Sequence, residues 1–209
     1  MEEALDRPLS SVLPVIQKRI MENTTYHGIP TLKNPLDFWV YQEIICQARP
    51  EFIIEIGNLY GGSTLALAHI CDSIETGAVI AVDSTHDKIA PAVKNHPRVK
   101  LITGDACNVF PQVRTAVSGA KSVMIIEDSL HTCEHTLRVL ESYSAVVGIG
   151  NYFIVEDGIC HHGLDVGPMP GPYEAVEMFL RSHKEFIANR DMENFGITWN
   201  PKGYLKRIA

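Results

Sequence analysis

From Glu51 onward, short apolar runs alternate with segments of helical periodicity, and this alternation restricts the possible folds more than any other feature. Five runs are rich in β-branched residues and almost continuously apolar, which is typical of strands buried on both faces of a sheet. These strand candidates are residues 52–57, 78–83, 99–105, 122–128 and 151–157. Helix candidates follow them at residues 62–74, 86–96, 107–119, 132–147 and 173–190. This order predicts an α/β fold with a doubly wound, mostly parallel sheet.

The two ends of the chain depart from this alternation. Residues 195–208 predict an antiparallel hairpin that turns at residues 200–203. Residues 158–172 form a long loop rich in Gly and Pro, and loops of this length are often lids. Residues 1–49 have the pattern of a helical N-terminal segment or lid, which leaves 50–209 as the main domain. The apolar side chains of the N-terminal segment need a partner, so we expect a homo-oligomer.

Charge and cysteine content disfavour several classes of protein. The 209 residues carry a formal net charge of -7, which argues against nucleic acid or an anionic membrane as the main partner. The five cysteines are scattered without a CxxC pair, so neither a disulfide framework nor a structural zinc site is expected. The first residues are acidic rather than basic, and no apolar run approaches the ~20 residues of a transmembrane helix. We therefore expect a protein of the reducing cytoplasm.

The stretch "EIGNLYGGST" (55–64) joins the first strand to the first long helix. Gly57 permits a sharp turn, and Gly61 lets a ligand approach the backbone at the start of the helix. Ser63 is a candidate cap of that helix. The spacing fits neither the G-x-G-x-x-G of Rossmann dehydrogenases nor a P-loop, which needs Gly-Lys-Ser/Thr. The ligand of this loop is therefore expected to be of another kind.

Acidic residues stand at the ends of three successive strands. Glu55 lies in the end of the first strand, Asp83 ends the second, and Asp105 ends the third and is followed by Ala106. At the end of the second strand a carboxylate can accept hydrogen bonds from both hydroxyl groups of a ribose. A helix cap or a turn is an equally good explanation of Asp83 or Asp105 taken alone. Three acids beside the topological switch point together favour a nucleoside-like ligand.

A second acidic cluster is expected where the fourth and fifth strands end. Asp128 ends the fourth strand and Glu156 with Asp157 ends the fifth, and strands in these positions are normally neighbours in such a sheet. Three carboxylates this close need a cation, and ligation by oxygen suits Mg²⁺, Mn²⁺ or Ca²⁺. His131 follows Asp128 by three residues. The alternatives are a simple turn at Asp157, a capping role for Glu156, and a place for His131 at the start of a helix.

Three stretches carry a resemblance to a known family, namely "IIEIGNLYGGST", "EDSLHT" and "YFIVEDG". The E-x-G-x-x-x-G pattern resembles motif I of the class I S-adenosylmethionine (SAM)-dependent methyltransferases. The D-x-x-H and E-D pairs are similar to those of the cephalosporin hydroxylase-like (CmcI-type) and rhamnosyl O-methyltransferase family. The similarity runs from about residue 27 to about residue 205. It implies a Rossmann-like class I methyltransferase fold with a seven-stranded sheet and a C-terminal antiparallel hairpin.

The resemblance also implies roles for individual residues. Residues 50–209 would be the methyltransferase domain, and His131 would be the general base. The residues expected to bind the divalent metal are Asp128, Glu156 and Asp157. The residues expected to contact SAM are Glu55, Gly57, Gly61, Ser63, Asp83, Asp105, Ala106 and Asp128.

The resemblance and the acidic cluster together imply a SAM-dependent, divalent-metal-assisted O-methyltransferase (EC 2.1.1) that acts on a hydroxyl of a small molecule, sugar-bearing or another natural product. The alternatives are a metal-dependent hydroxylase or oxygenase and a non-catalytic SAM- or nucleotide-binding module. Non-haem iron usually takes two histidines and one carboxylate, whereas this site offers mostly carboxylates. Catechol-type methyltransferases use a lysine near their metal, and "EDSLHT" holds no equivalent. His161 and His162 are expected to face solvent or the acceptor.

Overall fold

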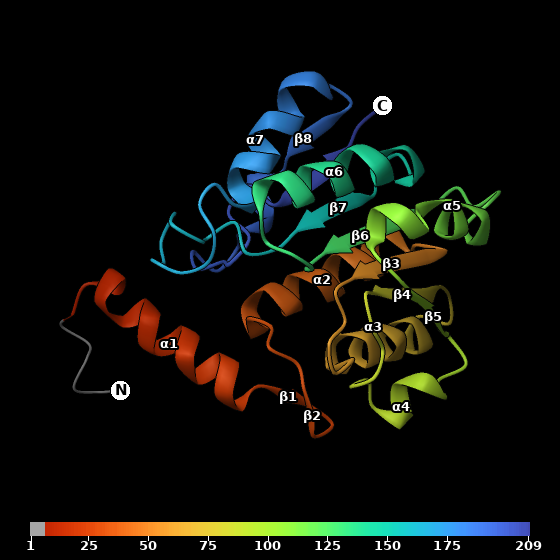
Figure 1. Cartoon of the computed structure of the whole chain (residues 1–209), viewed down its shortest axis with the longest axis horizontal. Helices are drawn as coiled ribbons and strands as arrows, with labels where there is room; N and C mark the ends of the chain where they lie inside the picture. Colours follow the sequence, from red (N-terminus) through yellow and green to blue (C-terminus); the bar gives the residue numbers. More distant parts are fainter. Residues whose placement is uncertain (1–6) are drawn as a thin grey trace.

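The computed structural model describes residues 7–209, which form one central sheet with helices on both faces (Figure 1). The first six residues of the predicted N-terminal segment 1–49 lie outside this range. The sheet order is β5-β4-β3-β6-β7-β9-β8. Neighbouring strands from β5 to β7 are parallel, whereas β9 and β8 are antiparallel additions at one edge. The predicted doubly wound sheet of seven strands with a C-terminal hairpin is therefore confirmed.

The strands of this sheet match the predicted runs closely from the first to the fifth. Their bounds are β3 Phe52–Ile56, β4 Ala78–Asp83, β5 Val99–Thr103, β6 Val123–Glu127, β7 Tyr152–Val155, β8 Phe186–Ala188 and β9 Tyr204–Arg207. A small two-stranded sheet precedes it, formed by β1 Thr25–Tyr26 and β2 Ile29–Pro30.

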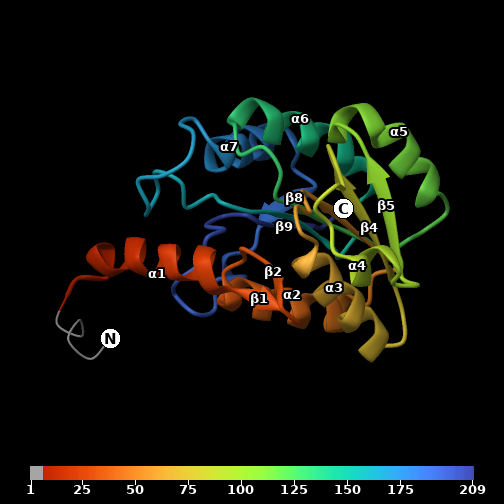
Figure 2. The ribbon, with the colours of Figure 1, turned by 60° about the horizontal axis from the view of Figure 1, so that its bottom comes forward.

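The helices pack in two layers, one on each face of the sheet (Figure 2). α2 and α3 contribute to the core on one face, and α5, α6 and α7 to the core on the other. The α-helices are α1 Leu9–Asn23, α2 Pro35–Ala48, α3 Gly62–Ser73, α4 Pro91–Lys94, α5 Ala106–Ala116, α6 Cys133–Tyr143 and α7 Pro172–Ser182. Two short 3₁₀ helices are η2 Ser144–Val146 and η3 Arg190–Met192. Within residues 7–209, no helix combines the length and the apolar composition needed to cross a membrane.

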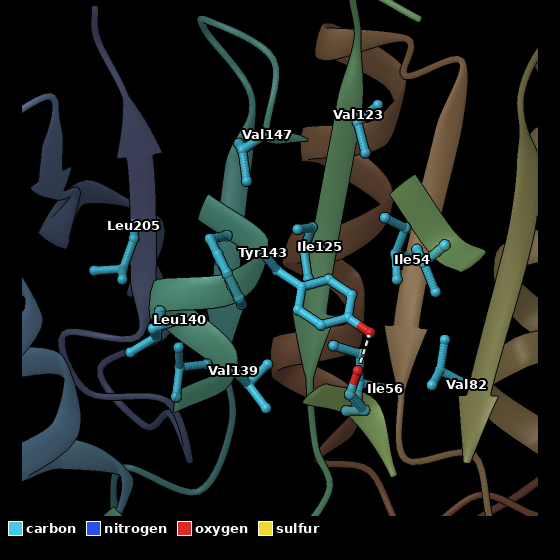
Figure 3. Close-up of a cluster of buried hydrophobic side chains, with 14 of the residues drawn as sticks. Ile54, Ile56, Val82, Val123, Ile125, Val139, Leu140, Tyr143, Val147 and Leu205 are labelled. Carbon is cyan, nitrogen blue, oxygen red and sulfur yellow. Dashed lines mark hydrogen bonds between the residues drawn. The ribbon is translucent and has the colours of Figure 1, made fainter. Parts of the chain in front are cut away.

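The core under α5 and α6 fixes the start of α5 (Figure 3). Ile54, Ile56 and Ile125 of the sheet point into this core. Tyr143 of α6 is fully buried among them, and its hydroxyl donates a 2.7 Å hydrogen bond to the carbonyl oxygen of Ala106. This bond holds the first residue of α5 at the end of β5, where the sequence predicted a ligand contact.

The core on the opposite face joins the N-terminal segment to the sheet. α2 begins after Asn34, whose side-chain oxygen accepts a 3.1 Å hydrogen bond from the backbone N–H of Leu36. The helix then buries four apolar residues against alternating positions of β3 and β6, and these are Val40, Tyr41, Ile44 and Ile45. The start of α2 is therefore held rigidly against the sheet.

The first helix, α1, is arranged differently and projects from the body of the molecule (Figure 1). It contains no buried residue. Leu13 and Ile20 are partly buried and pack against Ile159, Leu164 and Trp199. α1 therefore covers the loop that follows β7 rather than the sheet.

The strand register brings the acidic strand ends to one edge of the sheet. Ile56 of β3 is paired with Val82 of β4 and with Glu127 of β6, and Glu127 is paired with Val155 of β7. The residues that directly follow these positions are therefore neighbours in space. The expectation that the fourth and fifth strands are adjacent is confirmed.

The first strand of the C-terminal hairpin was predicted in the wrong place. It is Phe186–Ala188, which lies in a segment predicted as helix, because α7 already ends at Ser182. Residues 195–203 form no strand. Thr198 and Trp199 bind Asp37 of α2 instead: the Thr198 hydroxyl and the Trp199 backbone N–H, at 2.8 Å, both donate to its carboxylate. The Trp199 N–H is thus satisfied by a buried side chain rather than by a strand partner.

Candidate active site

A cavity of about 720 Å³ lies at the carboxyl ends of the parallel strands, the edge at which open α/β sheets bind their ligands. Its walls come from the loops after β3, β4, β5, β6 and β7, from α1 and from the segment before α2. Most of the predicted site residues line it, namely Gly57, Ser63, Asp83, Asp105, Ala106, Asp128, His131 and Asp157. Three predicted site residues do not line it, and these are Glu55, Gly61 and Glu156.

The glycine loop packs tightly against the end of β6. Gly57 has a φ of 89° and its N–H donates a 2.8 Å hydrogen bond to the carbonyl of Val82. A Cβ atom at this position would lie 1.9 Å from the carbonyl oxygen of Asp128, so a larger residue would push the two strand ends apart. Gly61, with a φ of 83°, is the N-cap of α3. The predicted capping role of Ser63 is therefore wrong, and Ser63 lies in the first turn, where it lines the cavity.

Glu55 lies beneath this loop and is fully buried. Its carboxylate accepts hydrogen bonds from the hydroxyl of Thr64 and, at 2.9 Å, from the side-chain amide of Asn58. Burial raises the pKa of Glu55. These contacts make Glu55 a support of the loop, and its neighbours in the loop are the residues that face the cavity.

Asp83 and Asp105, the acids predicted at the ends of the second and third strands, each accept structural hydrogen bonds and also line the cavity. Asp83 Oδ2 accepts hydrogen bonds from the backbone N–H groups of Asn58, at 2.7 Å, and Leu59, at 3.0 Å. Burial alone would raise the pKa of Asp83, but these hydrogen bonds to the charged form hold it below its usual value. Asp105 is the N-cap of α5 and accepts the N–H of Asn108 at 3.0 Å. The capping explanation of Asp105 is therefore correct, and it leaves the residue on the cavity wall.

Asp128, His131 and Asp157 form a group of potential metal ligands within residues 7–209. One ligand atom from each lies within 4.8 Å of the others. His131 Nε2 is 3.3 Å from Asp157 Oδ2 and 3.9 Å from Asp128 Oδ1. Burial, followed by the charge of Asp128, raises the pKa of Asp157 to about 6. One imidazole with two carboxylates is the reverse of the two-histidine, one-carboxylate set of non-haem iron oxygenases.

Glu156 is separated from this group because it binds a lysine. The ammonium of Lys33 lies between two acids, donating to Asp128 Oδ2 and, at 2.6 Å, to Glu156 Oε1. Burial alone would lower the pKa of Lys33, but the carboxylates of Asp128 and Glu156 raise it above its usual range. The positive charge expected beside the acids is thus partly supplied by the chain itself. The predicted ligand set of Asp128, Glu156 and Asp157 is not the set that the structure groups together.

Sequence reasoning missed Lys33. It lies 95 residues before Asp128 and 123 before Glu156. The one local signal was its position directly before Asn34-Pro35, a helix start that holds its neighbour in place. No pattern in the sequence links that helix start to the fourth and fifth strands.

His131 lies in the connection between β6 and α6. The cap of α6 is the next residue, Thr132, whose hydroxyl accepts the N–H of His135 at 3.3 Å. The side chain of His131 is 33% exposed and lines the cavity. The structural role at the helix start thus belongs to Thr132, and the ring of His131 remains on the cavity wall.

The loop after β7 covers the rest of the cavity with apolar side chains, including Ile159, Leu164 and Val166. Its two histidines lie outside the cavity lining. His161 Nδ1 is 3.0 Å from Asp165 Oδ1, within the same loop. His162 Nε2 is 2.5 Å from Glu174 Oε1, and its ring stacks on Tyr173 with centroids 3.8 Å apart. These contacts hold the loop together and attach it to α7.

Comparison with known proteins identifies relatives over almost the whole described chain. The sequence model of the family described as rhamnosyl O-methyltransferase/CmcI matches residues 18–208. The rhamnosyl O-methyltransferase of Mycobacterium tuberculosis (strain ATCC 25618 / H37Rv) is 32% identical over 197 residues, which are 90% of this chain and 80% of that protein. The rhamnosyl O-methyltransferase of Mycobacterium leprae (strain TN) is 30% identical over 200 residues, 90% of this chain and 85% of that protein.

Solved structures share the fold at lower identity. A CmcI structure with Mg and SAM matches with a TM-score of 0.70 and 19% identity over 89% of this chain and 77% of that chain. The O-methyltransferase NovP matches with a TM-score of 0.61 and 14% identity over 96% of this chain and 99% of that chain. The family match covers most of the sequence, and the two mycobacterial relatives are 30% identical or more. The family is the one that the sequence motifs resembled. The chain therefore belongs to the rhamnosyl O-methyltransferase/CmcI family of methyltransferases.

Proposed function

We propose that this protein is a SAM-dependent, divalent-metal-assisted O-methyltransferase that acts on a hydroxyl of a small molecule, with sugar-bearing or other natural products as the acceptor class. The observation that carries the proposal is that one cavity is lined by the glycine loop and Asp83 and also by His131 with two carboxylates. The relatives support a sugar acceptor, because they are named rhamnosyl O-methyltransferases. In this proposal residues 50–209 are the methyltransferase domain and residues 1–49 are an N-terminal segment and lid.

The side of the cavity at the ends of β3, β4 and β5 is the proposed SAM site. SAM supplies the methyl group, and the protein binds and orients it for in-line transfer. Asp83 would accept hydrogen bonds from the ribose hydroxyls at Oδ1, in exchange for the Ser84 hydroxyl that donates to it at 3.1 Å, while Oδ2 stays bound to the N–H groups of the glycine loop. Asp105 and Ala106 would lie along the adenine. The remaining contacts come from the loop and the end of β6 and involve Gly57, Ser63 and Asp128. Glu55 supports the loop from below, and Gly61 supports it as the N-cap of α3.

Asp128 and Asp157, together with Glu156, are the proposed ligands of a divalent cation, Mg²⁺ or else Mn²⁺ or Ca²⁺. The donor set fits, because Mg²⁺ in enzymes is often held by one or two carboxylates and completes its shell with water or substrate. When bound, the cation supplies Lewis-acid polarisation of an acceptor oxygen. Glu156 is the third proposed ligand, and its Oε1 also accepts a hydrogen bond from Lys33.

His131 is the proposed general base. Its ring lines the same cavity as the two carboxylates, so a hydroxyl group brought there is within reach of the imidazole. Asp157, 3.3 Å from Nε2, would stabilise the imidazolium that forms when the proton arrives. The apolar lid residues exclude water from this side of the cavity and suit the apolar body of a sugar-bearing acceptor.

Binding of S-adenosylhomocysteine, the demethylated product, tests the cofactor site. We expect it to raise the melting temperature, since a ligand at 100 times its Kd stabilises the folded state by about 2.7 kcal/mol. NAD should have no such effect, because the loop lacks the dinucleotide spacing. Differential scanning calorimetry with each ligand measures both shifts. Stabilisation by NAD and none by S-adenosylhomocysteine would contradict the methyltransferase assignment.

Asp83→Ala should weaken binding of S-adenosylhomocysteine by ~1–3 kcal/mol, because a charged acceptor is lost and two loop N–H groups lose their partner. Isothermal titration calorimetry measures the change. Asp165→Ala is the matched control, since its side chain is 97% exposed and it lies outside the cavity lining. Equal affinity in the Asp83 variant and the control would remove Asp83 from the cofactor site.

We also expect a homo-oligomer in the cytoplasm. α1 carries exposed apolar side chains, among them Leu9 at 49% and Val15 at 56% exposure, which a second copy of the chain could cover. All five cysteines are unpaired, which fits a reducing compartment. Light scattering should give a mass of at least twice the 23.2 kDa of the chain. A single monomeric species at micromolar concentration would refute the oligomer.

A further inference from the structure

Three polar residues to which the proposed function gives no role form a hydrogen-bonded network between β6 and α6. Glu127, at the end of β6, is 2% exposed. The hydroxyl of Ser129 donates to its carboxylate, with Oγ 2.8 Å from Oε1 and 3.1 Å from Oε2. The same Oγ is 3.0 Å from Nε2 of His135, in the first turn of α6. A buried carboxylate is thus connected through Ser129 to a histidine ring.

His135 is the member of this network that is placed to meet a ligand. Its side chain is half-buried, and His135 and Ser129 both line the cavity. The backbone N–H of His135 completes the cap of α6 by donating to Thr132, so the start of the helix does not depend on the ring. Because Nε2 is directed at Ser129, Nδ1 is the ring nitrogen that is left for a further partner.

The ring lies beside the part of the cavity proposed for the adenine of SAM. Burial lowers the pKa of His135, while the nearby charge of Asp105, the N-cap of α5, acts in the opposite direction. α6, which carries His135, is fixed against the start of α5 by the hydrogen bond from Tyr143 to the carbonyl oxygen of Ala106. Asp105 and Ala106 therefore form one wall of this part of the cavity, and Ser129 and His135 form the wall next to it.

The chemistry of the ring suits a nucleobase. A pKa below the usual value leaves the imidazole of His135 uncharged at pH 7, as the adenine base is. Flat aromatic side chains bind bases by stacking on them, and polar side chains bind the base edges by hydrogen bonds. His135 also stands apart from the group of potential metal ligands, which is formed by Asp128, His131 and Asp157.

We infer that His135 contacts the adenine base of SAM, and that Ser129 and Glu127 hold its ring in place for this contact. The inference rests on the proposed SAM site, in which it adds a contact from α6 to those of Asp105 and Ala106. A ring that is already fixed by a hydrogen bond loses little conformational freedom when the cofactor binds. The buried Glu127 thereby contributes to cofactor binding without touching the cofactor.

Nuclear Overhauser effects between the base and the protein test the contact directly. The protein has nine histidines, which can be labelled together with ¹³C. With S-adenosylhomocysteine bound, the adenine protons H2 or H8 should give cross-peaks to one imidazole ring. These cross-peaks should be absent from His135→Gln, in which the new side chain can still bond to Ser129. Bound S-adenosylhomocysteine without such cross-peaks in the wild type would overturn the inference and leave the proposed cofactor site standing.

His135→Ala should weaken binding of S-adenosylhomocysteine by ~5–50-fold, within the range of one contact between a base and an aromatic side chain. Isothermal titration calorimetry measures the change. Glu134→Ala is the matched control, since Glu134 is exposed in the same helical turn and lies outside the cavity lining. Its affinity should stay within ~2-fold of the wild type, as expected for an independent site.

His135→Gln provides the same measurement if His135→Ala does not fold, because it keeps a partner for Ser129. Affinity equal to that of the control in a folded His135 variant would overturn the inference. Failure of the proposed function gives a different result: the wild type itself would then bind no S-adenosylhomocysteine, and the inference would fall with the cofactor site.

Discussion

His131→Ala should lower the rate of methyl transfer by ~10²–10⁴, the usual contribution of a general base. The ring lines the cavity and has its Nε2 3.3 Å from Asp157 Oδ2, so an accepted proton would be held beside a carboxylate. Folding should be unaffected, because Thr132 rather than His131 caps α6. Single-turnover measurement with saturating SAM and a hydroxylated acceptor isolates the chemical step.

Two further observations distinguish catalysis from structure. S-adenosylhomocysteine should bind His131→Ala as it binds the wild type, because the proposed cofactor residues lie at the ends of β3, β4, β5 and β6 and His131 is not among them. His96→Ala is the matched control, since His96 pairs with Asp72 outside the cavity lining and its loss should leave the rate unchanged. Near-normal turnover of His131→Ala would mean that another group accepts the proton. Loss of cofactor binding would mean that the ring has a structural role.

The acidic edge of the sheet was predictable because it depends on local patterns and one topological rule. Buried parallel strands are recognisable as apolar runs, and the fourth and fifth runs end in acidic residues. Once the fourth and fifth strands are placed side by side, Asp128 and Asp157 must approach each other, and the structure has one ligand atom from each within 4.8 Å of the other and of His131. The sequence pattern did not reveal that the neighbouring acids Glu156 and Asp157 have different surroundings. Asp157 adopts a left-handed φ of 57° and lines the cavity, whereas Glu156 is buried on Lys33.

The features that the sequence did not reveal depend on contacts between distant segments. Lys33 lies just before α2, and α2 packs against the face of the sheet opposite to α6. This packing of α2, rather than any local pattern, brings the ammonium of Lys33 to Glu156. The hairpin was misplaced for a similar reason, since the apolar stretch before Asn200 resembles a strand locally. In the structure Asp37 binds that stretch at Thr198 and Trp199. A single buried carboxylate, placed by α2, thus decides the local structure of a segment about 160 residues away.

Asp157→Asn should weaken Mn²⁺ binding by at least ~100-fold, more than the 10–100-fold typical of an outer-shell partner, and methyl transfer should fall with it. Asn has the shape of Asp and tolerates the left-handed conformation of this residue, with its φ of 57°, so the change removes charge and little else. Asp165→Asn, in the same loop with a 97% exposed side chain, is the control and should keep full affinity.

The same carboxylate predicts how metal binding varies with pH. Burial and the neighbouring Asp128 raise the pKa of Asp157 to about 6 in the metal-free protein, so below that pH a proton occupies the oxygen that the ion needs. The apparent Mn²⁺ affinity should therefore fall as the pH is lowered from 7 to 5, with release of a proton on binding at the lower pH values. Titration calorimetry in buffers of different ionisation enthalpy measures that proton. Affinity independent of pH in the wild type, together with unchanged affinity in Asp157→Asn, would place the cation away from Asp157.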